Sequence, residues 1–167
     1  GFETVSRPWD SLTASRIEAQ QMRTSETLAL VLRSSQEDMS VHFNSTVYSV
    51  NHALRDYEQA LGEDSNPALI PQAQRAVEDW AVTHEAFMDS LSTGNYDAAV
   101  YQATAIDPDG EPTAASAFNA VDNSLAQLID EARESMREYL MQGLNAMTLV
   151  STGVSLATFG AIIAVWL

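Results

Sequence analysis

The chain has 167 residues, a length typical of one domain, and its formal net charge at pH 7 is −15. This charge argues against nucleic-acid binding, which needs basic patches, and against binding to an anionic lipid surface. The sequence contains no cysteine, so disulfides and thiolate metal sites are excluded.

The first predicted helix has a less regular pattern than the later ones. Apolar residues lie near its two ends, at Trp9 and at Leu28 to Leu32, and polar residues occupy most of the turns between them. A break near residues 34–35 would separate this helix from the next one. One bent helix is the alternative.

Three later segments have apolar residues at steps of three and four, which place them on one face of a helix. The first stripe runs from Met39 to Leu61, the second from Ala73 to Leu91, and the third from Phe118 to Gly143. Gly62 and the Thr93–Asn95 segment are typical helix ends. Strand patterns are almost absent, so the sequence predicts an all-α fold.

A short helix and a loop connect the second and third stripes. Residues 96–100 predict the short helix, and residues 107–112 form the clearest loop of the chain. The acidic residues of this loop resemble the start of a calcium loop, but the bidentate glutamate at its end is missing. We therefore expect a turn, for which the proline and glycine residues are sufficient.

Residues 147–167 carry no charge and no proline. A helix of this length spans about 31 Å, close to the ~30 Å hydrocarbon core of a bilayer. The third stripe continues into this run without a breaker, so we predict one helix that enters a membrane. A buried core helix of a soluble protein is the alternative.

Together these patterns predict an antiparallel four-helix bundle whose last helix continues into a transmembrane helix. Residues 1–143 would form an extracytoplasmic bundle at the cell membrane, and residues 144–167 the transmembrane helix, with the chain stopping at the membrane edge. Small residues at spacings of four would let other transmembrane helices of the same protein approach closely. They are Gly153, Ala157, Gly160, Ala161 and Ala164.

The sequence contains no pattern typical of a catalytic site, so we expect no enzyme activity. It has no Gly-rich phosphate loop, no nucleophile motif and no metal-binding helix motif. His42 and His52 lie off the apolar stripe of their helix, and together with His84 they are the only histidines. We therefore predict neither a metal site nor a cofactor.

The best candidates for ligand binding are Arg16, Arg23, Glu26, Trp80 and His84. His84 lies on an apolar stripe, one turn after Trp80, where a core residue with a satisfied hydrogen bond is the usual case. A ligand contact inside the bundle is the alternative. Arg16 and Arg23 are seven residues apart, hence on one face, and guanidinium groups bind carboxylates in a bidentate manner. A solvated arginine face is the simpler interpretation of that pair.

Four short stretches, in this order and spacing, carry a resemblance to a known family. They are residues 16–32 (RIEAQQMRTSETLALVL), Trp80 with His84, residues 94–100 (GNYDAAV) and residues 117–122 (AFNAVD). They resemble actinobacterial membrane proteins of the GlnX type, in which helical segments outside the cell precede a hydrophobic helix. More generally, the chain resembles the extracytoplasmic four-helix-bundle sensor domains of bacterial receptors.

The resemblance implies a signalling function. It implies that the protein relays extracellular amino-acid availability, either directly or through a solute-binding lipoprotein outside the cell, to a soluble Ser/Thr kinase inside. A structural or assembly module of a membrane complex, without a small-molecule ligand, is the alternative function.

Overall fold

In the computed structural model, the backbone is described for residues 2–32 and 36–166, and side chains for residues 6–32 and 36–150. These residues form five α-helices and one short 3-10 helix, and no strand occurs in the described ranges. The elements are α1 (Phe2–Leu32), α2 (Gln36–Leu61), η1 (Gly62–Asp64), α3 (Leu69–Ser92), α4 (Tyr96–Thr104) and α5 (Ala114–Trp166). The predicted all-α class is confirmed.

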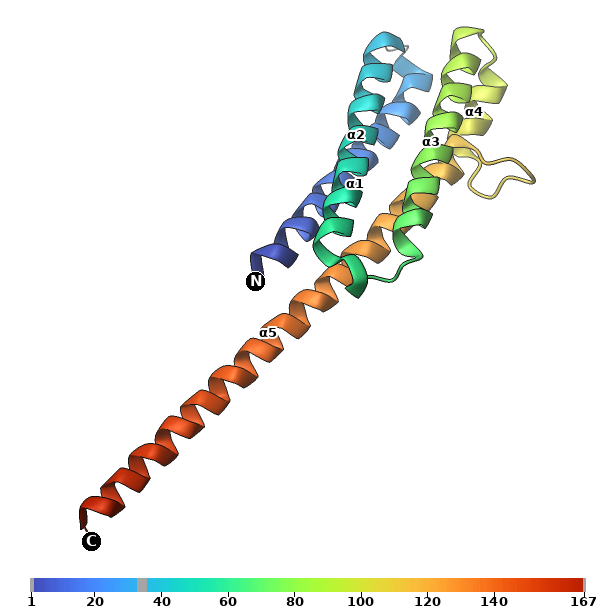
Figure 1. Cartoon of the computed structure of the whole chain (residues 1–167). Coiled ribbons are helices and arrows are strands. Elements are labelled where there is room, and N and C mark those ends of the chain that lie inside the picture. The colour runs from blue at the N-terminus through green and yellow to red at the C-terminus, as the bar shows by residue number, and fades with distance from the viewer. Residues whose placement is uncertain (1, 33–35, 167) are drawn as a thin grey trace.

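The helices pack in two side-by-side pairs, α1 with α2 and α3 with the first part of α5 (Figure 1). α1 also packs against α5 and α2 against α3, while the short α4 lies beside α3 and α5. Because α1 and α2 contact each other along their lengths, they are two helices rather than one bent helix. We call α1 to α4, together with residues 114–136 of α5, the packed region.

The first two predicted apolar stripes, and the third as far as Ala132, form the core of the packed region, whereas Tyr139 and Gly143 at the end of the third stripe are exposed. Their buried members include Phe43, Leu54, Trp80, Leu125 and Leu128, each less than a tenth exposed. Of the apolar residues expected at the end of α1, Ala29 is buried, whereas Leu28 and Leu32 are exposed. The buried face of α1 consists of Pro8, Leu12, Ser15, Ala19, Met22, Glu26 and Ala29 among the residues with described side chains, again at steps of three and four.

Two glycines end helices as the sequence predicts. Gly62 directly after α2 and Gly94 after α3 have φ values of +35° and +73°, which favour glycine because it lacks a Cβ. Asn95 then caps α4, since its side-chain oxygen accepts a hydrogen bond from the backbone N–H of Ala98 at 3.3 Å. The turn between α3 and α4 is therefore determined by its own residues, Gly94 and Asn95.

The second half of α5 projects from the packed region (Figure 1). Among the α5 residues with described side chains, Ala132 is the last that is fully buried, and every residue from 137 to 150 is exposed. A Cβ at Gly143 would meet no atom within 4 Å, so the described residues give no close helix contact there.

The predicted transmembrane segment lies mostly outside the residues whose side chains are described. This holds for all of its predicted packing residues: Gly153, Ala157, Gly160, Ala161 and Ala164. Among the residues described in full, no helix is long and apolar enough to cross a membrane.

Candidate functional site

Glu26 lies at the centre of a polar group inside the packed region. Its side chain on α1 is fully buried, and Oε1 accepts a hydrogen bond from the indole Nε1 of Trp80 at 3.0 Å. The other oxygen, Oε2, lies 3.7 Å from Nδ1 of His84 and 3.9 Å from Nη1 of Arg23. Both distances exceed a hydrogen bond. We call Arg23, Glu26, Trp80 and His84 the buried cluster.

Aromatic rings surround the buried cluster. The His84 imidazole stacks on Phe43 with ring centroids 3.7 Å apart and planes within 2°. Trp80 meets Phe43 edge-on at 4.8 Å and lies 5.5 Å from Phe118. α1, α2, α3 and α5 therefore all contribute a side chain to this layer.

His84 is only 3% exposed, as expected for a residue on the apolar stripe. The expected satisfied hydrogen bond is absent, because neither ring nitrogen has a partner among the described residues. Oε2 of Glu26 and Nη1 of Arg23 are unpartnered in the same sense. Such buried polar groups are uncommon, because each costs about 1–3 kcal/mol, and they need a functional or structural explanation.

Arg23 joins the buried cluster to α4. Its Nη2 donates a hydrogen bond to the backbone carbonyl of Ala103, in the last turn of α4. A helix C-terminus carries partial negative charge, which favours a cation there. Burial lowers the pKa of Arg23, and the nearby Glu26 carboxylate opposes this shift.

Arg16 lies apart from the buried cluster and binds a carboxylate of this chain. Its Nε and Nη2 donate to the two oxygens of Asp122 on α5, at 2.8 and 3.1 Å, and Gln20 adds a bond of 3.0 Å. These bonds raise the pKa of Arg16 and lower that of Asp122. Of the five predicted ligand-binding residues, the structure thus brings together four and gives Arg16 a separate partner.

Sequence reasoning missed a second polar group, at the point where α5 leaves the packed region. Glu131 accepts hydrogen bonds from the hydroxyls of Tyr57 and Ser65 and from the backbone N–H of Asn66, the last two at 2.6 and 3.0 Å. We call these four residues the Glu131 junction. It ties α5 to the end of α2 and to the segment that leads into α3.

The Glu131 junction shifts the ionisation of its members. Burial acts to raise the pKa of Glu131, but the hydrogen bonds from Ser65, Tyr57 and Asn66 outweigh it, and the net direction is downward. Burial and the Glu131 carboxylate both raise the pKa of Tyr57. The hydrogen bonds of the junction therefore favour the ionised carboxylate of Glu131 over its protonated form.

The remaining histidines do not join either group. His42 is exposed, and His52 is an exposed residue whose Nδ1 lies 3.1 Å from Asp56 on the same helix. Within the described residues, no group of three or more histidine and acidic side chains is placed to hold a metal ion.

Comparison with protein-family models, with curated proteins and with solved structures found no match for this chain.

Proposed function

We propose that this chain is the extracytoplasmic sensor module of a membrane signalling protein. In this proposal α1, α2, α3 and the first part of α5 act as an antiparallel four-helix bundle. The rest of α5 then leads into a transmembrane helix formed by residues 144–167. The module relays amino-acid availability, sensed directly or through a solute-binding protein, to a signalling protein such as a cytoplasmic kinase.

The observation that carries the proposal is the continuity of α5. One helix supplies Phe118 to the layer around the buried cluster, Glu131 to the junction, and then a projecting segment. A displacement of this helix at the cluster would be transmitted along its axis, because packed interiors move between discrete arrangements rather than deforming smoothly.

The side chains of the projecting segment support a location beside a membrane or other membrane helices. Its exposed residues include Leu140, Met141, Leu144, Met147 and Leu149, each more than half exposed. A monomeric soluble protein rarely exposes so many large apolar side chains in one segment, because covering them is favourable. The bilayer and the other transmembrane helices of the same protein are the partners we propose for this surface.

The positions of the family-like stretches also support the proposal. Residues 16–32 supply Arg23 and Glu26 of the buried cluster, and Trp80 and His84 complete it. Residues 117–122 supply Phe118, which packs on Trp80, and Asp122, which binds Arg16. Three of the four family-like stretches thus contribute side chains to the buried cluster or to the rings that pack on it, whereas residues 94–100 lie in the α3–α4 turn and at the start of α4.

A topology experiment tests the location. The chain has no cysteine, so Asp109→Cys, in an exposed loop, creates one labelling site. We expect a membrane-impermeant maleimide to label this variant in intact cells, and the cysteine-free chain serves as the control. Labelling only after cell lysis would contradict an extracytoplasmic module.

A further inference from the structure

A groove of about 330 Å³ lies between α1 and α2, and three of the residues that line it, Ala14, Tyr48 and His52, are exposed. We call it the α1–α2 groove. Its volume lies at the lower end of the ~300–1,000 Å³ range of small-molecule sites. The other residues that line it are Ser11, Ser15, Glu18 and Ser49. The groove therefore combines a size suited to a small molecule with a mostly polar lining.

One end of the α1–α2 groove is suited to a cation. Glu18 on α1 is half-buried, and within the described residues no basic side chain forms an ion pair with its carboxylate. Tyr48 of α2 lines the same groove, and the face of an aromatic ring attracts cations. Ser49 adds a hydroxyl oxygen that can accept a hydrogen bond. The groove thus offers an anion, a ring and a hydroxyl to an ammonium or guanidinium group.

Helical register places the opposite charge beyond the other end of the groove. α1 and α2 run in opposite directions (Figure 1), so Ser11 and His52 lie at the end away from Glu18. Residues three or four apart on a helix share a face. On α1, Arg7 therefore lies one turn beyond Ser11. On α2, Arg55 lies one turn beyond His52, and both arginines are exposed. Guanidinium groups bind carboxylates in a bidentate manner, so this end suits a carboxylate.

We propose that the α1–α2 groove binds an amino acid with a basic side chain, such as lysine or arginine. The side-chain cation lies against Glu18 and Tyr48, and the carboxylate faces Arg7 and Arg55. From Ser11 to Glu18, α1 rises about 10 Å, so the two ends of the groove suit charges that an extended chain holds apart. A small amino acid such as glycine carries its two charges close together and cannot reach both ends. The net charge of −15 also favours the approach of a cation.

The α1–α2 groove adjoins a contact between α1 and α5. Arg16 lies between the lining residues Ser15 and Glu18 in the sequence. Its guanidinium donates hydrogen bonds to both carboxylate oxygens of Asp122 on α5, at 2.8 and 3.1 Å. A ligand that draws α1 toward α2 therefore acts on the helix that holds α5. The inference rests on the proposed function, because it names the ligand class that the sensor detects directly.

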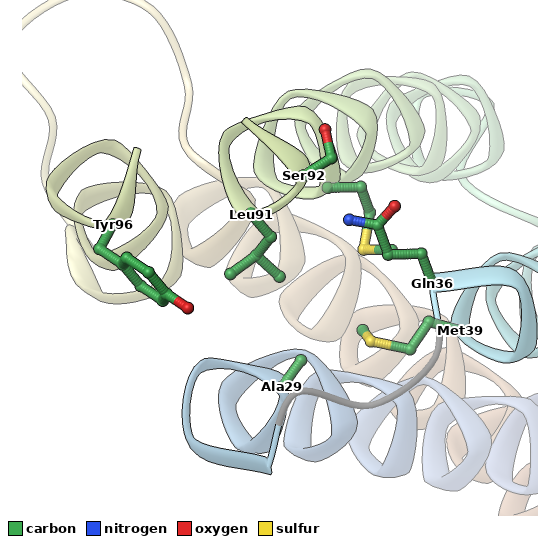
Figure 2. Close-up of a pocket in the computed structure, with 7 residues that line it drawn as sticks. Ala29, Gln36, Met39, Leu91, Ser92 and Tyr96 are labelled. Carbon is green, nitrogen blue, oxygen red and sulfur yellow. The ribbon is translucent and has the colours of Figure 1, made fainter. Parts of the chain in front are cut away.

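Three probes of similar length separate the two charged ends of the ligand. L-Lysine carries both charges, L-norleucine lacks the side-chain ammonium, and 1,5-diaminopentane lacks the carboxylate. In calorimetric titrations of the full chain, we expect L-lysine to bind at least about tenfold more tightly than either of the others, because each of these loses a hydrogen-bonded charge. L-Lysine should also shift the methyl NMR signal of Ala14 saturably. Met39 lines a separate pocket among α1, α2, α3 and α4 (Figure 2), and its methyl signal should not move.

A variant of Glu18 tests the cation end. Glu18→Gln removes the anion and keeps the size of the side chain, so it should erase the advantage of L-lysine over L-norleucine. Glu85→Gln, at an exposed position of α3 outside the lining, is the matched control. It makes the same change in net charge and should leave that advantage intact.

A double variant tests the carboxylate end. Arg7→Gln combined with Arg55→Gln should erase the advantage of L-lysine over 1,5-diaminopentane, whereas Arg75→Gln combined with Arg133→Gln, also at exposed positions, should preserve it. Equal binding of L-lysine and either of the other probes to the unmodified chain, or an advantage that survives the matching variant, would overturn the inference. The titrations do not measure a cellular response. Their failure would therefore leave the membrane-signalling proposal, which includes sensing through a solute-binding protein, to be judged by topology and response.

Discussion

The indole nitrogen of Trp80 lies 3.0 Å from Oε1 of Glu26, and both side chains are completely buried. Fifty-four sequence positions separate the two residues, on α3 and α1. A buried carboxylate with one neutral donor and no hydrogen-bonded cation is costly for stability. We therefore propose that Glu26 serves the sensing function rather than folding.

A double-mutant cycle on Trp80→Phe and Glu26→Leu measures this contact. Trp80→Phe alone leaves a buried carboxylate oxygen without its donor, whereas in the Glu26→Leu background no acceptor remains to be orphaned. We expect a coupling free energy of about 1.5–3 kcal/mol, the range for hydrogen bonds to charged groups. Urea unfolding of the four proteins gives the value, and a coupling near zero would show that the bond does not form in solution.

Phe118→Ala should destabilise the packed region by roughly 3–5 kcal/mol, because it truncates a core aromatic that packs on Trp80. Tyr48→Ala is the matched control, since this aromatic side chain is 65% exposed, and we expect a change within about 0.5 kcal/mol. Thermal unfolding followed by circular dichroism compares the two variants. Similar losses for both would mean that the core is placed incorrectly.

The Arg16–Asp122 pair predicts a pH dependence of stability. Hydrogen bonding to Arg16 holds the pKa of Asp122 below its usual range, so the folded state favours the carboxylate. This contribution is present above the unfolded pKa of about 3.9 and is lost as pH falls through the lower folded pKa. Asp122→Asn should therefore cost about 1 kcal/mol or less at pH 7, because the pair is partly exposed, and less still below about pH 3.

Asp109→Asn is the control for this pH series, because Asp109 lies in an exposed loop. Denaturant titrations at pH 7, 5 and 3 should give parallel stability curves for Asp109→Asn and the unmodified chain. The Asp122→Asn curve should converge toward them as pH falls. A difference that stays constant with pH would mean that Asp122 contributes through packing and not through its charge.

The Glu131 junction should fix the direction in which α5 leaves the packed region. Spin labels at Glu58→Cys and Gln142→Cys, both exposed, report the distance between α2 and the projecting segment in a chain that has no native cysteine. Glu131→Ala removes the acceptor of three hydrogen bonds and should broaden the distance distribution. Glu134→Ala changes the same charge one turn later, where the ion pair is within α5, and should not broaden it. Equal distributions for both variants would rule out the junction as a fixed point.

The sequence predicted three of the four long helices well, because their buried faces are mostly apolar residues at helical spacing. The stripe of α1 escaped prediction because it includes Ser15 and Glu26. Nothing local marks Glu26 as buried, since its donor comes from α3. Hydrophobic periodicity predicts burial from residue type alone. The prediction fails where a polar side chain is buried and a distant residue supplies its hydrogen bond.

This dependence on local sequence pattern also explains which residues of the candidate site could be predicted. Trp80 and His84 were identified because a histidine on an apolar stripe is unusual, whereas Arg16 and Arg23 were considered only as a pair for a ligand carboxylate or as a solvated face, and Arg16 binds a carboxylate of the chain itself. That carboxylate belongs to Asp122. Glu131 has no local signal that separates it from Glu134 or Glu138, because its partners come from α2 and the segment before α3.

The central claim is that α5 transmits a change from the packed region to the membrane, and Gly143→Pro tests it most directly. Gly143 lies in the projecting segment, where a Cβ would meet no neighbour, so the matched variant Gly143→Ala should leave the fold unchanged and favour the helix by about 1 kcal/mol. Proline removes a backbone donor and clashes with the preceding turn, at a cost of ~3 kcal/mol or more.

The measurement is the change in protein phosphorylation after amino acids are added to cells that carry each variant, with cells lacking the gene as the baseline. Thermal unfolding first establishes that the packed region of both variants remains folded. The account predicts a gene-dependent response with Gly143→Ala and its loss with Gly143→Pro. A response that persists through the proline variant, or no gene-dependent response from the unmodified protein, would contradict the signalling mechanism and favour a structural module.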